Sequence, residues 1–507
     1  MSRVVVSYEK REQSQECCGG SRQIGFSSFA RFHFFYFWKF EHSTVTHVSF
    51  SRVRRIEIFD IDTIFGAMRL QAPRHPWTSK EVAGVLGGRR LSTRLQALER
   101  FDAIIVGGGP AGMATALALQ KTGWSRCLVL EKREEPEVMQ GGTALGLWTN
   151  AWKALDALGV GDRVRESSGR VNRVELCRED GDRVLTSFDL ATCDGGPHEF
   201  GGVLRGRLVQ CLADAIDKEK TELKFGVECR SCVVDEGGGV MLETHDGHTY
   251  GTHVLIGADG VNSVVAHAYG DVRNRTMGTT FVGQTAIRGI AEYASKDDMP
   301  MCIRQVLGTG VRAGVYPVSS HELYWYVCFP DTEWDGDIIE QARDVLSSSK
   351  ESWKTSIVWD AINRTPAGRV SRNRLSDRWD LAELLPNNST PNIPIALAGD
   401  ALHPMTPNLG QGGCTALEDA VILASYLQEC VGNENIRPCD RIDMYTRERA
   451  RRCIPLTVRA NLMGLVLQSA LAPVVFARDT FISNAFDPSH FLDHATFDCS
   501  KRLSSLR

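Results

Sequence analysis

Residues 101–119 read Phe101-Asp-Ala-Ile-Ile-Val106-Gly-Gly-Gly-Pro-Ala-Gly112-Met-Ala-Thr-Ala-Leu-Ala-Leu119, and they give the strongest indication of the fold. The apolar run before the glycines is typical of a buried parallel strand, and the small residues after them are typical of a helix packed closely on that strand. The glycines fit the G-x-G-x-x-G pattern. They let backbone N–H groups approach a pyrophosphate at the positive N-terminus of the helix. The motif alone is weak, but its strand and helix context predicts a dinucleotide site.

A second apolar run, Cys127-Leu-Val-Leu130, delivers Glu131 nineteen residues after Gly112. An acid at this spacing after the motif binds the ribose hydroxyls of an adenine dinucleotide and disfavours a 2′-phosphate. The site is therefore expected to hold FAD or NAD and to reject NADP. By contrast, Gly308-Thr-Gly310-Val-Arg-Ala313 also fits the relaxed pattern, but Pro317 follows it closely and no helix is expected there.

Two further buried strands end in acids. Val254-Leu-Ile-Gly-Ala-Asp259-Gly260 is one, and Ile393-Pro-Ile-Ala-Leu-Ala-Gly-Asp400 is the other. Ligands lie at the carboxyl ends of strands in doubly wound sheets, so both acids are expected to face the cofactor crevice. A glycine-rich loop, residues 407–413, then precedes a predicted helix from Cys414 to Tyr426. This second anion site, about 300 residues from the first, is more than a single NAD needs.

Together, the three segments resemble the group A FAD-dependent monooxygenases, the aromatic hydroxylases, over roughly residues 101–467. Residues 399–420 look most like the plant branch of this family, described as salicylate-hydroxylase-like or zeaxanthin-epoxidase-like. Their sequence is Gly-Asp-Ala-Leu-His-Pro-Met-Thr-Pro-Asn-Leu-Gly-Gln-Gly-Gly-Cys-Thr-Ala-Leu-Glu-Asp-Ala. The resemblance implies FAD as cofactor, NADPH or NADH as electron donor and O₂ as co-substrate. It implies hydroxylation or epoxidation of a small aromatic or lipophilic acceptor through a C4a-hydroperoxyflavin.

The resemblance also assigns residues. It places the first glycine loop at the FAD pyrophosphate, Glu131 with Lys132 at the adenosine ribose, Arg205 at the cofactor, and the pair Asp259 and Gly260 at FAD and the nicotinamide. Asp400 belongs on the ribityl or pyrophosphate side, and the 407–413 loop against the isoalloxazine. Ala266 stands where the family often has arginine. The complete expected cofactor set is Gly107, Gly108, Gly109, Pro110, Ala111, Gly112, Glu131, Lys132, Arg205, Asp259, Gly260, Asp400, Pro407, Gly410, Gln411, Gly412 and Gly413.

The expected fold class is α/β, with a Rossmann-like FAD-binding domain built on a mixed or parallel sheet, an antiparallel-sheet substrate domain and C-terminal helices. Glycine turns and alternating aromatics over 281–289 and 311–329 predict the antiparallel sheet. The expected boundaries are a leader at 1–100, FAD-binding parts at 101–170, 201–270 and 391–430, a substrate-domain hairpin at 171–200, the main substrate domain at 271–390 and a C-terminal helical segment at 431–507.

Charge separates the leader from the rest. The first 100 residues contain 16 Lys/Arg against 9 Asp/Glu, whereas the whole chain carries −4, which excludes nucleic acid as the main partner. From Met68 the leader is basic and nearly acid-free, which resembles an organelle transit peptide. We hypothesise that Met68 is the functional start and that the protein is chloroplast-targeted, with a disordered basic arm and a cytoplasmic location as the alternative.

No residue is assigned as catalytic from the pattern, because the flavin carries the chemistry. His403 and Pro407 are weak candidates, and a structural histidine bonded to backbone is the favoured interpretation of His403. Tyr316, Tyr324, Trp325 and Tyr326 could line the substrate pocket, but alternation sends only every second one to a given face. Nothing indicates a metal site, and the oligomeric state is not predicted.

The segment from Ala460 to Ala477 is free of charge between Arg459 and Arg478. It favours a buried helix over the domain junction, with a peripheral membrane face as the alternative and no transmembrane span expected. Rival functions are a reductase or halogenase on the same fold, or a flavoprotein that has become a non-catalytic partner module.

Overall fold

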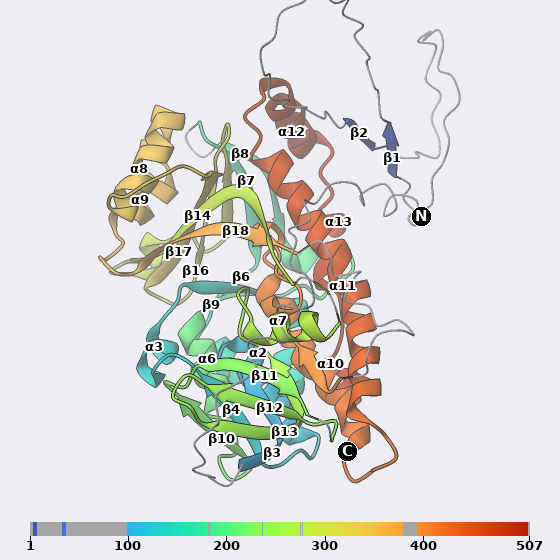
Figure 1. Ribbon diagram of the computed structural model, residues 1–507. Coiled ribbons are helices and arrows are strands. Elements are labelled where there is room, and N and C mark those ends of the chain that lie inside the picture. Colours follow the sequence, from blue (N-terminus) through green and yellow to red (C-terminus); the bar gives the residue numbers. More distant parts are fainter. Residues whose placement is uncertain are drawn as a thin grey trace, which may run out of the picture. The chain divides into compact units, whose positions relative to one another are not determined.

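The computed structural model describes residues 4–7, 33–36 and 99–504, apart from 181–182, 236, 274, 276 and 379–392. The chain divides into two units, Met1–Arg94 and Leu95–Arg507. In the first, β1 (Val4–Ser7) pairs antiparallel with β2 (His33–Tyr36). Most of the basic leader, including the segment from Met68, lies outside the described residues, so the transit-peptide hypothesis stays a prediction. Everything below concerns the second unit (Figure 1).

The first sheet of this unit is mixed, as expected. Its core is parallel because apolar strands buried on both faces alternate with crossover helices. Ile104 and Ile105 in its centre are fully buried. Its order is β10 (Thr221–Phe225), β4 (Cys127–Glu131), β3 (Glu99–Val106), β13 (Thr249–Gly257), β12 (Val240–Thr244) and β11 (Cys229–Val234), with β19 (Ile395–Leu397) beside β13. Strand β12 runs antiparallel to both of its neighbours, β13 and β11, so it alone is reversed relative to the other strands of this sheet.

Helices cover this sheet, and α2 packs against α10. The first begins at Pro110, whose ring presets the helical φ and whose missing N–H costs nothing in the first turn. Nine consecutive residues of α2, from Ala111 to Leu119, are buried, so the helix lies between other layers. The helices of this part are α2 (Pro110–Lys121), α3 (Glu135–Gln140), α4 (Thr149–Ala157), α5 (Gly161–Glu166), α6 (Arg205–Ala213), α7 (Val264–Val272) and α10 (Gly412–Leu427).

The second sheet confirms the predicted antiparallel texture, with one exception: β15 runs parallel to β7. Its order is β18 (Val370–Asp377), β14 (Thr280–Glu292), β17 (Glu322–Pro330), β16 (Arg312–Pro317), β15 (Ile303–Leu307), β7 (Arg173–Arg178) and β8 (Arg183–Asp189). Helices α8 (Ile338–Ser349) and α9 (Ile357–Asn363) pack beside it. The stretch from Gly308 to Ala313 forms the turn after β15 and the first two residues of β16, so the rejected glycine motif indeed opens no helix.

A three-stranded sheet lies next to the substrate sheet. It consists of β5 (Ala144–Trp148), β9 (Phe200–Leu204) and β6 (Gly169–Val171), and both β6 and β9 contact β16. The rings of Phe200 and Tyr316 meet edge to face at 5.3 Å between centroids. These contacts join the two large sheets, so that residues of both can line one site.

The C-terminal helices are α11 (Pro438–Leu467), α12 (Ala472–Asn484), α13 (Pro488–Leu492) and α14 (Lys501–Ser504). The expectation of a buried helix over 460–477 is wrong in part. Leu471 and Phe476 are 68% and 74% exposed, whereas the two charged residues of α12, Arg478 and Asp479, are buried and paired with each other. Arg478 lies on the inward side of α12 because its Nη1 donates to the carbonyl of Gly308, and the apolar residues of the opposite side therefore face outward.

In the described part of the chain, no one helix combines the length and hydropathy of a bilayer span. Helices α11 and α12, which meet at 112°, reach that threshold only as a pair.

Candidate functional site

The first glycine loop joins β3 to α2 and has room only for backbone. Gly107 has a φ of 108°, which disfavours any side chain, and a Cβ on it would overlap the carbonyl of Ala258. A Cβ on Gly112 would overlap the carbonyl oxygen of Gly107. The loop therefore brings strand, turn and helix start into direct contact, and it presents its N–H groups at the N-terminus of α2.

Glu131 ends β4 beside this loop, and its side chain is only 5% exposed. Its Oε2 accepts a hydrogen bond from the N–H of Gly108 at 2.7 Å, and its Oε1 accepts one from the N–H of Arg133 at 3.0 Å. The carboxylate thus stands at the expected position, with its orientation fixed. The neighbouring Lys132 points elsewhere: its Nζ lies 3.7 Å from a carboxylate oxygen of Glu228, on the surface.

Arg205 begins α6 and reaches over the glycine loop. Its Nη2 lies 3.0 Å from the place where a Cβ on Gly109 would stand. Burial and the neighbouring charge of Arg133 lower the pKa of Arg205, while Glu131 and Asp400 oppose that shift. A partly buried cation over a row of N–H groups suits a pyrophosphate.

The Asp259-Gly260 turn follows β13, but its acid serves the protein itself. Oδ2 of Asp259 accepts hydrogen bonds from the N–H groups of Val264 at 2.8 Å and Val265 at 3.4 Å, so it holds the start of α7. Burial raises the pKa of Asp259. Ala266, which stands where the family often has arginine, is 1% exposed, and its N–H donates to Oγ of Ser263 at the start of α7.

Asp400 and the 407–413 loop lie together on the other side of the site. Asp400 is exposed in a short 3-10 turn (η6, Gly399–Ala401), and its Oδ1 is 3.8 Å from where a Cβ on Gly412 would stand. Pro407 opens the turn η7 (Pro407–Leu409), and Gly410 closes it with a φ of 63°. A Cβ on Gly413 would lie 3.3 Å from Leu145. Again a helix N-terminus, that of α10, is lined by glycine.

Gln411 is the member of the expected set whose side chain turns away. It is fully buried, and its Oε1 accepts a hydrogen bond from Nδ2 of Asn150 at 2.8 Å. Only its backbone, as the residue before α10, remains beside the site.

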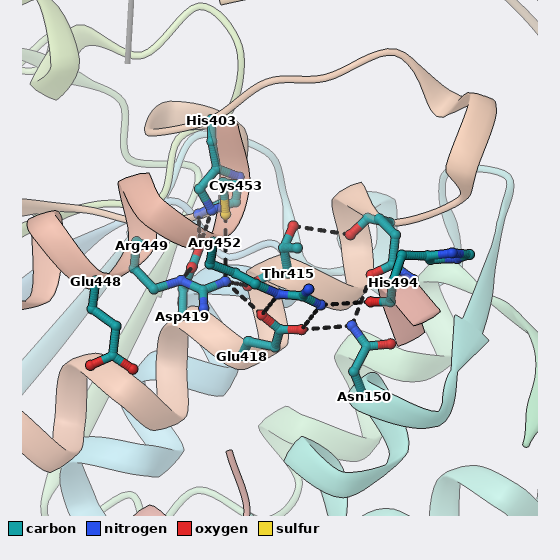
Figure 2. Close-up of polar contacts among 12 residues, drawn as sticks. Asn150, His403, Thr415, Glu418, Asp419, Glu448, Arg449, Arg452, Cys453 and His494 are labelled. Atoms are coloured by element: carbon teal, nitrogen blue, oxygen red, sulfur yellow. Dashed lines mark hydrogen bonds and ion pairs between the residues drawn. The ribbon is translucent and has the colours of Figure 1, made fainter. Parts of the chain in front are cut away.

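His403 does not face the site. It is fully buried, and its Nε2 lies 2.7 Å from Oδ2 of Asp419, which also accepts the N–H of Gly399 (Figure 2). Although burial acts in the other direction, the Asp419 carboxylate raises the pKa of His403 well above its ordinary value. The structural role fits, but the predicted partner was wrong: it is a buried carboxylate rather than backbone. This histidine anchors the Asp400 turn to α10.

A buried charge network continues from Asp419 (Figure 2), and it was not predicted from the sequence. Arg449 of α11, fully buried, donates from Nε to Asp419 at 2.6 Å and from Nη2 to Glu418 at 2.7 Å. Glu418 also accepts from Arg452 at 3.0 Å and from Asn150 at 2.6 Å. Two adjacent acids in an apolar helix were the overlooked signal, because buried carboxylates need partners. We call these residues, His403, Asp419, Arg449, Glu418, Arg452 and Asn150, the buried charge network.

The tyrosines separate as alternation predicts. Trp325 is fully buried on one face, where its Nε1 donates to Oγ1 of Thr365 at 2.7 Å. On the opposite face the rings of Tyr316 and Tyr324 lie 4.6 Å apart, and those of Tyr324 and Tyr326 lie 6.2 Å apart. This aromatic face reaches the 144–148 strand, since a Cβ on Gly146 would come within 3.7 Å of Tyr316.

Two further residues of the site were missed. Arg312 of β16 donates to the side chain of Asn408 in the 407–413 loop, and Asn408 donates to the carbonyl of Ala460 in α11 at 2.9 Å. A single asparagine in a loop could not be recognised as important from one sequence. In the structure, Asn408 connects the 407–413 loop both to the substrate sheet and to α11.

Comparisons with known proteins agree with this geometry. The chain matches the FAD binding domain family over residues 100–460. Monooxygenase 2 of Arabidopsis thaliana is 30% identical over 415 residues, which cover 78% of this chain and 97% of that protein. The FAD-dependent urate hydroxylase of Klebsiella pneumoniae is 25% identical over 360 residues, which cover 70% and 90%.

Solved structures show the same fold. Klebsiella pneumoniae HpxO, complexed with FAD and uric acid, has a TM-score of 0.67 at 23% identity, and the match covers 80% of this chain and 99% of that one. A salicylate hydroxylase substrate complex has a TM-score of 0.62 at 18% identity, covering 81% and 98%. These matches cover between 90% and 99% of the known proteins.

Proposed function

The chain belongs to the FAD binding domain family of FAD-dependent monooxygenases, and we propose that it uses NADPH or NADH and O₂ to hydroxylate or epoxidise a small organic acceptor. The observation that carries the proposal is the meeting of two glycine-lined helix N-termini with an aromatic sheet face. Ala111 of the first loop lies next to Gly399, beside Asp400, and Leu145 links Gly413 to the strand that faces Tyr316. One end suits a dinucleotide, and the aromatic face at the other end suits a ring compound as acceptor.

Most residues of the expected set could contact FAD directly, whereas a few could not. The N–H groups of the first glycine loop and Arg205 would hold the pyrophosphate, and Glu131 would hold the adenosine ribose. The exposed carboxylate of Asp400 would meet the ribityl side, with the 407–413 loop beside the isoalloxazine. Lys132 does not fit, since its Nζ is engaged at the surface, and Gln411 would contribute only backbone. Asp259 would act indirectly, through the start of α7.

The protein's own part in the chemistry is positioning and charge stabilisation. Bound FAD, once reduced, supplies the activation of O₂. The N-terminus of α10 would stabilise negative charge on the reduced isoalloxazine by about 0.3–1 kcal/mol, or roughly 2 if buried. The aromatic face would hold the acceptor and exclude water. We propose that the nicotinamide visits this site transiently, because no second G-x-G-x-x-G motif opens a helix among the described residues.

The test is to purify the protein with its flavin and follow NADPH oxidation, O₂ consumption and product mass together. The proposal expects O₂ uptake stimulated by an aromatic compound, with one oxygen atom in the product. Reduction or halogenation of the acceptor would favour the rival enzyme classes. A flavin that NADPH and NADH fail to bleach with any acceptor would favour a non-catalytic flavoprotein.

We also propose peripheral contact with a lipid surface at the α11–α12 bend. The outward residues of α12 include Leu471, Phe476 and Phe481, each more than half exposed, while both charged residues of the helix point inward. Flotation of the purified protein with phosphatidylcholine vesicles tests this, and Phe476→Ser with Phe481→Ser is expected to abolish it. Recovery entirely at the bottom of the gradient would contradict the proposal.

Chloroplast targeting remains a proposal based on the basic stretch from Met68. Fusing residues 68–100 to a fluorescent protein tests it directly.

A further inference from the structure

The face of the substrate sheet that bears the tyrosines also bears an arginine. Arg288 of β14 stands opposite Tyr326 of β17, and Tyr324 of β17 stands opposite Tyr316 of β16. Directly paired residues of antiparallel strands project from the same face, and so do residues two apart on one strand. Arg288 therefore shares its face with all three tyrosines.

This face is directed at the cofactor side. The ring of Tyr316 contacts Phe200 of β9, in the small sheet between the two large ones. The charge of Arg288 reaches the Asp400 carboxylate. It also opposes the rise that burial causes in the pKa of Tyr316 and Tyr324. Arg288 thus lies on the aromatic face, and its charge is felt at Asp400 on the cofactor side.

Arg288 differs from the other arginines of its sheet. Arg304 donates to Glu175 at 2.9 Å, Arg372 pairs with Asp331 at 3.2 Å, and Arg312 is bonded to Asn408. Among the residues that the structure describes from 99 to 504, neither Arg288 nor the hydroxyls of Tyr316 and Tyr324 have a hydrogen-bond or ion-pair partner.

A partly buried guanidinium without a counter-ion is unfavourable, and proteins normally pair such a charge. The tyrosine hydroxyls beside it stay protonated at neutral pH, because burial raises the pKa of Tyr316 and Tyr324. They are therefore available as donors. The Arg288 guanidinium and the two tyrosine hydroxyls thus place three donor groups on one aromatic face. This arrangement fits a flat ligand that carries acceptor oxygens and negative charge.

We infer that Arg288 binds the carboxylate of an aromatic acid, with the Tyr316 and Tyr324 hydroxyls donating to the same ligand. The fork of N–H groups on arginine matches a carboxylate in a bidentate way. The inference rests on the proposed function and narrows it: the acceptor is an acidic ring compound. Arg288 is then the residue that determines specificity for charge.

The experiment measures binding to the FAD-loaded enzyme by titration calorimetry. The probes are salicylate and 3-hydroxybenzoate, each paired with its neutral amide. Wild type is expected to bind at least one acid about tenfold or more tightly than its amide. Arg288→Gln is expected to weaken binding of that acid by about ten- to a hundredfold, the range for charge-assisted hydrogen bonds, with amide binding unchanged. Arg288→Lys should restore part of the loss, since it keeps the charge without the fork.

The matched control is Arg374→Gln, in β18 of the same sheet, where the side chain is 59% exposed and paired with Asp331. It is expected to leave every dissociation constant unchanged. Flavin content, measured by absorbance, accompanies each titration. The inference is overturned if wild type prefers no acid over its amide, if Arg288→Gln weakens acid and amide equally, or if that variant loses its flavin, which would place Arg288 at the cofactor.

The two proposals fail differently. If wild type prefers acids through Arg288 but no compound drives O₂ consumption, the anion site stands and the monooxygenase proposal fails. If oxygenated product forms while Arg288→Gln binds the acids as wild type does, only the anion site fails.

Discussion

The cofactor side and the substrate face of this protein differ in how far their polar side chains are paired within the protein. On the cofactor side, the charged groups that shape the loops are already bonded within the protein: Glu131 to Gly108, Asp259 to Val264, and Asp419 to His403 and Arg449. On the substrate face, Arg288 and the hydroxyls of Tyr316 and Tyr324 carry no recorded partner among the described residues.

The difference shows which atoms contact each ligand. A dinucleotide that is always the same can be held by backbone N–H groups, which internal bonds fix in place. An acceptor that differs between relatives must be recognised by side chains that remain available. If this is correct, substitutions that break the internal bonds or the close packing of the cofactor side should lower stability or weaken FAD binding.

The largest effect is expected for Arg449→Met, which leaves Glu418 and Asp419 without their shared cation in a fully buried place. Breaking a buried ion pair from one side costs about 3–5 kcal/mol. The free energy of unfolding, measured in urea, should fall by that amount. Arg451→Met, at an exposed position of the same helix, is the control and should change little. Equal stability of the two variants would contradict the role of the network.

Gly112→Ala should come next. The added Cβ overlaps the Gly107 carbonyl, so the helix and the loop must move apart. The N–H groups of the loop would then no longer point at the pyrophosphate position. We expect the dissociation constant for FAD to rise by about a hundredfold or more, comparable with losing two charge-assisted hydrogen bonds. Flavin reconstitution of the apoprotein measures it. Gly237→Ala, where the nearest atom is a side-chain oxygen at 3.3 Å, is the control. Retention of flavin by Gly112→Ala would show that the loop tolerates displacement.

Arg205→Gln removes a cation but no backbone contact, so its effect should be smaller. We expect FAD to bind about tenfold more weakly, as for one charge-assisted hydrogen bond. The matched control is Arg207→Gln. Arg207 is exposed two residues further along α6, so this variant should bind FAD normally. Loss of binding in both variants would indicate that helix α6, rather than the guanidinium of Arg205, matters.

The smallest effect concerns acid stability. Against the influence of burial, Arg449 with Arg452 holds the pKa of Glu418 below its ordinary 4.5, and His403 with Arg449 holds that of Asp419 below 3.8. Their stabilisation is therefore complete above pH 4.5 and is lost as pH falls through the lowered pKa values. The stabilisation that His403 contributes depends on pH in the opposite direction. It is complete below pH 6.5 and is lost as the pH rises through the raised pKa of this histidine.

Urea midpoints measured from about pH 7 down to pH 3 test the acid limb. Glu418→Gln should flatten the loss of stability at low pH. Glu429→Gln, a surface residue paired with Arg441, should leave the pH profile as it is. A profile that both variants share with wild type would mean that other carboxyls dominate acid unfolding.

Much of the cofactor side could be predicted because its requirements are local. The turn at Gly107, the helix start at Pro110 and the spacing to Glu131 depend on neighbours in the chain. The side chain of Gln411 and the partner of His403 could not be predicted, because Asn150 and Asp419 reach them from other elements. The exposure of Phe476 was missed for the same reason: hydropathy does not show which neighbours a helix finds.

The fold class, the dinucleotide loops and the family could be inferred from the amino-acid sequence, since glycine conformation and strand burial follow from residues close in sequence. Which arginine of the substrate sheet is left without a partner became visible in the folded structure alone. Pairing depends on register and on contacts such as Arg312 with Asn408, which lie 96 residues apart in the chain. Arg288 becomes a candidate for substrate binding only after every other pairing is known.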